Sequence, residues 1–472
     1  MVSLAGILAG ILAGIRSIIH LVAMLHIVVN SKRYWSGAWQ GRRTAASPWL
    51  LAAAVLGSIM IESPVQAQPQ PPDPAAGQAS FDLAGLQGIL AIQQLDGWLL
   101  YDHAGQNPIA RELIQPAGEP TRRWFYLIPT EGEPVALIHR IDARSFERVP
   151  GRKIVYTAQR QLEQGLTVML AGKKRLAMEY SPKAELPSLS RVDAGTLEQV
   201  RSRKVKVRSS AELVQFARSL WGNDGRLSHH VAAHHLDELR KAALVFVARG
   251  IQRGNKVRES DVQKLIANGY RVRGLVGPPA VVAAGKHTAD PYYLPGADSD
   301  AVIEKGDLLV LGMSARVQSE KRTIVAEVTW VAFVGDRVPD SHASMFGVLV
   351  QARDAALALI EDRVGRRRAI KGFEVDRQAR KIISQAGHGD KFIHRTGHSL
   401  DTQVHGGGAN LDDYETHDAR NLVVGSGYAI APGIYSEGES GMRAEIDVYL
   451  GPTGVEVTTA RQTEITAILA SP

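Results

Sequence analysis

Three histidines lie within a dozen residues of one another in the last quarter of the chain: His394, His398 and His405. A Pro-Gly turn follows at 431–435 (Ala-Pro-Gly-Ile-Tyr), and then comes the strand-like segment 441–445 (Gly-Met-Arg-Ala-Glu). Imidazole and carboxylate groups bind divalent cations, and they also transfer protons in general acid–base catalysis. A single histidine would more often be structural, but this ordered set of polar groups predicts a catalytic or metal-binding site.

An acidic residue on an apolar segment upstream extends the pattern. Residues 326–330 read Ala-Glu-Val-Thr-Trp and precede the pair Val334-Gly335. In this order the segments resemble those of the pita-bread metallopeptidases, the family that includes aminopeptidase P, prolidase, methionine aminopeptidase and creatinase. The resemblance is closest to exported bacterial Xaa-Pro aminopeptidase-like proteins. It implies a pita-bread domain over 209–472 and a domain like the N-terminal one of aminopeptidase P and creatinase over 81–208.

The resemblance also implies a set of metal ligands. Enzymes of this family hold two divalent cations (Mn, Co, Fe or Zn) with two Asp, one His and two Glu side chains. The matching positions here are Gly312, Glu327, His398, Ala431 and Glu445. Two ligands are therefore missing and a third is one methylene longer. Glu327, His398 and Glu445 are expected to hold one divalent cation, in the way that catalytic sites with three protein ligands do, and a two-metal site is not expected.

The residues that would handle protons and substrate are altered as well. Ala431 stands where the family has a Glu that helps to activate water, and Ala cannot accept a proton. Tyr292 replaces a histidine that binds the scissile amide. His394 and His405 match histidines that contact the substrate or the tetrahedral intermediate, and Arg443 matches the arginine next to the last Glu. The resemblance thus makes His394, His405 and Arg443 the remaining catalytic candidates.

Other carboxylates near the motif are not expected to replace the missing ligands. Glu437 and Glu439 fall in a loop beyond the strand. Asp447 lies one strand repeat beyond Glu445, and we expect this to place it too far along the strand to act as a metal ligand.

Three functions are compatible with these residues. In the first, the chain is a degenerate relative that binds peptides or serves a structural role. In the second, it is a one-metal metallopeptidase that removes an N-terminal residue before proline. The third is a metal-independent creatinase-like hydrolase, which Tyr292 argues against. The first is favoured because a two-metal site that loses one metal loses both the orientation of its hydroxide and the stabilisation of the oxyanion.

The resemblance implies that the partner is a peptide with Pro at the second position and that the chain forms a homodimer.

The elements that must position these residues have two different patterns. Over 81–208, short apolar runs alternate with helical ones, which predicts an α/β layer domain with strands at 98–101, 124–128 and 135–138 and helices at 83–93 and 194–200. Over 209–472 we expect an α+β domain with helices outside a curved antiparallel sheet. Its helices are predicted at 210–249, 345–361 and 375–384, and its strands at 280–284, 308–317, 324–334, 427–434, 442–449 and 454–459.

Two apolar stretches precede these domains within a leader at 1–67. The second, 49–61, follows Arg42-Arg43 and ends at Val65-Gln66-Ala67, a small-x-small pattern, which predicts a signal peptide and therefore an exported protein, periplasmic or secreted. The first, 2–29, is long enough to span a bilayer, so it is either a membrane anchor or translated sequence upstream of the true start. Residues 68–80 form a Pro- and Gln-rich linker.

The composition excludes several classes of function. A chain of 472 residues calls for two domains rather than one core. The formal net charge is +7, but the basic residues are scattered rather than gathered on one face, so a nucleic-acid partner is not expected. The chain has no cysteine, which excludes disulfides, thiolate metal sites and a cysteine nucleophile.

Overall fold

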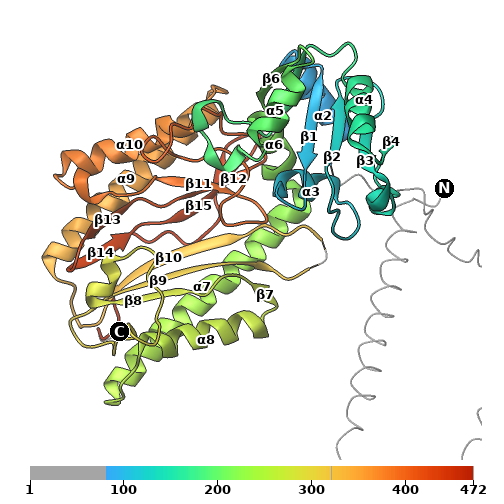
Figure 1. Ribbon diagram of the computed structural model, residues 1–472. Coiled ribbons are helices and arrows are strands. Elements are labelled where there is room, and N and C mark those ends of the chain that lie inside the picture. Colours follow the sequence, from blue (N-terminus) through green and yellow to red (C-terminus); the bar gives the residue numbers. More distant parts are fainter. Residues whose placement is uncertain (1–80, 320, 471–472) are drawn as a thin grey trace, which may run out of the picture. The chain divides into compact units, whose positions relative to one another are not determined.

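The computed structural model describes residues 81–319 and 321–470 (Figure 1). The leader at 1–67, with its signal peptide and its apolar stretch at 2–29, and the linker at 68–80 lie outside the described residues. Export and membrane association therefore stay predictions.

The first folded region is a six-stranded mixed sheet with helices on both faces. Its strands run in the order β4-β3-β2-β1-β5-β6, in which β1 to β3 pair antiparallel and the other neighbours pair parallel. The strands are β1 (Gly97–Asp102), β2 (Trp124–Pro129), β3 (Val135–His139), β4 (Arg152–Tyr156), β5 (Arg175–Met178) and β6 (Lys206–Ser209). The helices are α2 (Leu83–Ile92), α3 (Pro108–Ile114), α4 (Gln159–Met169) and α5 (Ala194–Arg201).

The side chains of β1 point alternately into two apolar cores, which explains why helices cover both faces of this sheet. Trp98 and Leu100 pack in one apolar core with α2 and α3, whereas Leu99 and Tyr101 pack in a second core with α4 and α5. Successive side chains of a strand point to opposite faces, so a strand that is apolar throughout needs cover on both. The predicted α/β layer domain is confirmed.

The second region begins with two helices instead of the single one expected at 210–249, and that prediction is wrong. α6 (Ala211–Ser219) ends before Leu220, and α7 (Gly222–Gln252) starts after it. Leu220 forms a β-bridge with Ser426, and the Trp221 indole donates a 2.8 Å hydrogen bond to the carbonyl of Leu400. These contacts with residues distant in the sequence break a pattern that is helical throughout.

Two antiparallel sheets form the body of this region (Figure 1). One joins β7 (Leu275–Val276) and β8 (Val281–Ala284) to β9 (Leu308–Val317), which pairs with β10 (Ala326–Phe333); β17 (Thr466–Ala467) adds to β10 in parallel. The other is β11 (Gly397–Leu400), β12 (Gly427–Ile430), β15 (Ile446–Leu450) and β16 (Val455–Val457). β13 (Gly433–Ser436) and β14 (Ser440–Arg443) form a separate hairpin.

Pairs of helices cover the outer faces of these sheets. α7 and α8 (Glu259–Val272) pack on one apolar core with β9 and β10, and α9 (Asp340–Gly365) and α10 (Gly372–Gln385) pack on another with β12 and β15. α9 is long and apolar enough to cross a bilayer, but Phe346, Leu349 and Ala356 on it are buried in the protein core, as a core helix requires. The predicted pita-bread architecture is confirmed.

The strands expected at 427–434 and 442–449 are each divided in two, so both predictions are wrong in the same way. β12 stops at Ile430 and β13 starts at Gly433, because Pro432 has no N–H with which to continue a ladder. β14 likewise stops at Arg443, two residues before Glu445. Ala431 and Glu445 thus sit at breaks in the sheet.

Candidate metal centre

A single cavity of about 330 Å³ brings together every position that the sequence marked as a ligand or catalytic candidate. Its walls come from β9, β10 and β11 and from the two strand breaks. The eight positions are Gly312, Glu327, His394, His398, His405, Ala431, Arg443 and Glu445. Their convergence is a structural finding, whereas their roles as ligands or catalysts stay predictions.

The register of β9 and β10 explains which of their residues face the cavity. Glu327 pairs with Ser314, and Thr329 pairs with Gly312. Ala326 and Val328, which alternate with them along β10, pack in the core beneath α7. Glu327 and Thr329 therefore share the face of β10 that looks into the cavity.

Register also aligns three residues across the second sheet. His398 on β11 pairs with Ala429 on β12, and Ala429 pairs in turn with Asp447 on β15. Residues in one such row lie on the same face, so His398 and Asp447 lie on the same face of the sheet with the small Ala429 between them.

Asp447 lies close to Glu327 and Glu445, contrary to expectation. Oxygen atoms of Glu327, Glu445 and Asp447 all lie within 4.8 Å of one another. The position two residues beyond Glu445 was expected to lie too far away, but the backbone N–H of Glu327 donates a 2.7 Å hydrogen bond to Asp447 Oδ2 and joins β10 to β15 at this point. Sequence spacing along one strand could not reveal a contact between two sheets.

The three carboxylates are buried with few hydrogen bonds. Thr329 donates its hydroxyl proton to Glu445 Oε2, but Glu327 Oε2 and Asp447 Oδ1 are buried with no hydrogen-bond partner among the described residues. Burial, and then the neighbouring carboxylates, raise the pKa of Glu327 and of Asp447 well above their ordinary values, and burial raises the pKa of Glu445. Buried carboxylate oxygens that lack hydrogen-bond donors are suited to bind a divalent cation, which would favour their ionised form.

His398 adds an imidazole to this cluster. Its Nε2 is 3.4 Å from Glu327 Oε2, and its Nδ1 lies 3.3 Å from the carbonyl oxygen of Ser399. Burial and then the nearby His405 lower its pKa well below the ordinary value, so the ring is neutral at pH 7. With Nδ1–H directed at the carbonyl, the lone pair of Nε2 faces a carboxylate. Two acceptors that face each other need a proton or a cation between them, and a neutral imidazole held by its other nitrogen is suited to bind metal.

His394 is already fully engaged by the protein. Arg443 Nε donates to the Tyr435 hydroxyl at 3.2 Å, and that oxygen lies 3.0 Å from His394 Nε2. His394 Nδ1 is 2.7 Å from the carbonyl oxygen of Arg395. Burial and then Arg443 lower the pKa of His394 to about 3, so its Nδ1–H donates and its Nε2 accepts from Tyr435. The sequence analysis did not single out Tyr435, although it ends the Pro-Gly-Ile-Tyr turn.

Two other residues lie at the mouth of the cavity. The ring of His405 meets that of His398 edge to face, with centroids 4.5 Å apart, and the outer side of His405 is exposed. The Tyr292 side chain, at the position of the missing histidine, is 73% exposed.

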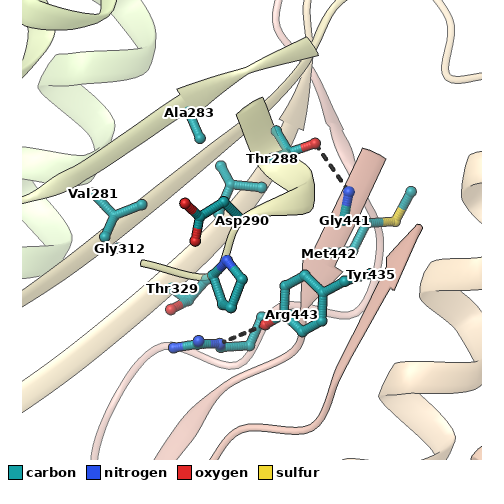
Figure 2. A pocket seen from close by; sticks show the side chains of 12 residues that line it. Val281, Ala283, Thr288, Asp290, Gly312, Thr329, Tyr435, Gly441, Met442 and Arg443 are labelled. Atoms are coloured by element: carbon teal, nitrogen blue, oxygen red, sulfur yellow. Dashed lines mark hydrogen bonds between the residues drawn. The ribbon is translucent and has the colours of Figure 1, made fainter. Parts of the chain in front are cut away.

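A smaller cavity lies beside the first, at Gly312 (Figure 2). It measures about 30 Å³, enough for one or two water molecules, and lies between Gly312, Thr329, Tyr435 and Arg443. A Cβ atom at Gly312 would lie 3.2 Å from Val281 Cβ, so an Asp here requires a small shift of Val281.

Comparison with known proteins agrees with this geometry. Residues 226–452 match the sequence profile of metallopeptidase family M24. The chain is 29% identical over 180 residues to an uncharacterized peptidase of Staphylococcus saprophyticus and 26% identical over 210 residues to the Xaa-Pro dipeptidase of Pyrococcus furiosus. These matches cover 38% and 44% of this chain and 46% and 55% of the relatives, so the chain spans about half the length of the curated relatives it matches.

Among solved structures, dipeptidase PepE of Mycobacterium ulcerans superposes with a TM-score of 0.63. The superposition covers 84% of this chain and 99% of that one at 20% sequence identity. At this identity the likeness shows the fold alone.

Proposed function

Because the chain carries a domain of metallopeptidase family M24 at residues 226–452, we propose that it binds peptides with Pro at the second position, holds one divalent cation and has lost appreciable peptide hydrolysis. One observation carries this proposal: Glu327, His398 and Glu445 remain together in one cavity, while Gly312 and Ala431 occupy its other two ligand positions. The sequence resemblance and the composition of the cavity support it together.

The donor set suits a single cation. Glu327 and Glu445 supply hard oxygen ligands and His398 a neutral imidazole, and the orphaned Glu327 Oε2 is directed at the group it would bind. A divalent cation bound there would polarise a peptide carbonyl and lower the pKa of water.

The cavity lacks the carboxylate base that the resemblance places beside the cation. Ala431 has no acceptor, and both nitrogens of His394 are engaged by Arg395 and Tyr435. Glu327 and Glu445 would be neutralised as ligands of the cation, so His405, which lines the cavity, is the remaining candidate base. General-base catalysis contributes about 10²–10⁴-fold, so weakening it together with the loss of one metal position would remove most of the rate.

The walls of the cavity suit a peptide rich in apolar surface. Pro278, Pro279, Pro291, Tyr292 and Leu294 line its outer part. Arg443 is buried; burial alone would lower its pKa, but the neighbouring Tyr435 and Glu445 keep that pKa above the ordinary value, so the arginine stays charged and can donate to a peptide carbonyl. The Pyrococcus furiosus relative is an Xaa-Pro dipeptidase by name, which supports proline at the second position.

Asp447 favours a second function, slow peptide hydrolysis with a single metal ion. A third carboxylate beside Glu327 and Glu445 strengthens cation binding, and a firmly held cation supports slow hydrolysis by a single-metal peptidase. A creatinase-like reaction is less well supported, because the exposed Tyr292 stands where such a reaction relies on a histidine.

Export and homodimer formation are further parts of this proposal. The signal-like segment at 49–67 supports export, and the resemblance of 81–208 to the N-terminal domain of creatinase supports pairing. Cell fractionation and sedimentation equilibrium test them directly.

The main experiment compares binding with turnover. We expect the purified protein to bind about one Mn²⁺ per chain and to bind an Xaa-Pro dipeptide calorimetrically, with no measurable release of the first residue. Measurable turnover with one metal would replace the binding function with the one-metal peptidase. Failure to bind any Xaa-Pro peptide would overturn both.

A further inference from the structure

We propose that Asp447 is a direct ligand of the bound cation, so that Glu327, Glu445 and Asp447 form a three-carboxylate centre for one hard divalent ion such as Mn²⁺ or Mg²⁺. This inference rests on the proposed function, and it adds to the ligands predicted from the sequence a carboxylate that the fold brings beside them. Asp447 on β15 would thus supply the carboxylate that is missing at Gly312 on β9.

The geometry around Asp447 is the first argument. Its carboxylate lies with those of Glu327 and Glu445 within 4.8 Å, and the side chain is fully buried. Glu445 lies directly before β15 and Asp447 lies on it, and Glu327 comes close to both from β10. Oxygen atoms this close can bind one ion together.

The hydrogen bonds of Asp447 are the second argument. Its Oδ2 accepts one N–H, from Glu327, and its Oδ1 has no partner among the described residues. Asp412, which is just as buried, accepts from the backbone N–H groups of Tyr414, Glu415 and Thr416 and from the Thr416 hydroxyl. A buried structural carboxylate is satisfied in this way, whereas Asp447 keeps an acceptor free.

The absence of a neutralising charge is the third argument. His229 Nε2 is 3.9 Å from Asp447 Oδ2, but the ring bonds to the Val325 carbonyl through Nδ1 and to the Thr458 hydroxyl through Nε2. Within the described residues, no Lys or Arg forms a salt bridge with Asp447. An external cation is therefore the group that matches this carboxylate.

The ligand types indicate the class of cation. Three carboxylates present hard oxygens, which suit Mn²⁺, Mg²⁺ and Ca²⁺, and the single imidazole of His398 makes Mn²⁺ the best match. Mn²⁺ is also a convenient probe, because the paramagnetic resonance signal of the free ion disappears on binding.

The test compares Asp447→Asn with a matched control, Asp142→Asn, in the full-length protein. Asp142 is also buried, and its Oδ2 accepts one backbone N–H, from Arg122, at 2.9 Å. The readouts are Mn²⁺ affinity by paramagnetic resonance, thermal unfolding in EDTA, and Xaa-Pro dipeptide binding. We expect Asp447→Asn to weaken Mn²⁺ binding by about 10–100-fold or more and Asp142→Asn to leave it unchanged.

The thermal readout distinguishes a ligand from a structural carboxylate. Asn at 447 keeps an acceptor for the Glu327 N–H and nearly the same side-chain shape, so we expect the metal-free Asp447→Asn protein to melt close to the wild-type temperature. Unchanged Mn²⁺ affinity in this variant would overturn the inference and leave the proposed function standing, as would a lower melting point with unchanged affinity. A wild type that binds no Mn²⁺ would also overturn it.

Two further results keep the proposals separate. If Asp447→Asn weakens Mn²⁺ binding but the wild type binds no Xaa-Pro peptide, the ligand inference stands and the proposed function fails. If Asp447→Asn does not fold, Asp447→Ser provides the same comparison, because it removes the carboxylate and keeps a small polar group.

Discussion

The backbone N–H of Glu327 donates a 2.7 Å hydrogen bond to the carboxylate of Asp447, and this contact joins strand β10 to strand β15. It holds the side chains of Glu327 and Asp447 on the same side of the junction. The cluster of carboxylates is therefore fixed by the backbone and is present before a ligand binds. Such preorganisation favours cation binding because the chain does not have to be reordered.

Cation binding should stabilise the fold. At a free Mn²⁺ concentration about 100 times the Kd, we expect roughly 2.7 kcal/mol of added stability over the protein in EDTA. The variant Glu327→Gln/Glu445→Gln should lose this gain. Thermal or urea unfolding with and without Mn²⁺ measures it, and equal stabilisation of the wild type and the double variant would place the ion elsewhere.

Restoring the family's ligands should rebuild a two-metal centre. We expect Gly312→Asp, Glu327→Asp and Ala431→Glu together to bind two Mn²⁺ per chain and to hydrolyse Xaa-Pro dipeptides. A Cβ atom added at Gly312 would crowd Val281 Cβ at 3.2 Å, so the metal-free variant should be destabilised by about 1–3 kcal/mol. Adding Val281→Ala should relieve the crowding. A restored protein that still takes up no second ion would show that the ligand positions are misplaced.

Tyr435→Phe should break the chain of hydrogen bonds behind the cavity. It removes the hydroxyl between Arg443 Nε and His394 Nε2, which are both partly buried. We expect a loss of about 1–3 kcal/mol of stability, because polar groups are left without a partner. Mn²⁺ affinity should not change, since Tyr435 does not touch the carboxylates. A large drop in Mn²⁺ affinity would instead assign Tyr435 to the cation site.

Glu179 should make the stability of the first folded region depend on pH. It is fully buried, accepts hydrogen bonds from Trp98 Nε1 at 2.5 Å and Asn107 Nδ2 at 2.9 Å, and burial raises its pKa to about 7. A carboxyl group with a raised pKa stabilises the fold fully below its unfolded pKa, and this contribution is lost as the pH rises through about 7. We expect roughly 2–3 kcal/mol to be lost between pH 5 and pH 8.

Glu179→Gln isolates this contribution. The variant loses an acceptor for Asn107, so it should be less stable than the wild type at pH 5, and the difference should shrink by roughly 2–3 kcal/mol at pH 8. Denaturant unfolding at the two pH values measures the change. A difference that stays constant would mean that Glu179 is ionised throughout this range.

Much of this architecture could be predicted from the sequence because the deciding information is local. The short apolar run from Trp98 to Tyr101 predicted β1, and β9 was predicted with its observed ends, 308 and 317. Each predicted site residue could be assigned from the sequence because it lies in a short, distinctive motif.

The errors arise where distant segments decide the structure. Leu220 leaves the helix because Ser426 pairs with it, and Pro432 divides a strand whose apolar pattern is continuous. Asp447 was dismissed because distance along β15 was considered, whereas its neighbour Glu327 comes from another sheet. The hydrogen bond between Tyr435 and His394 was missed for the same reason.

The most direct test of a single-cation site is the anomalous scattering of Mn²⁺ in crystals of the purified protein soaked at saturating concentration. We predict one anomalous peak per chain, bounded by the carboxylates of Glu327, Glu445 and Asp447 and adjacent to His398. Two peaks, with the second beside Gly312, or no peak in this cavity, would contradict the account.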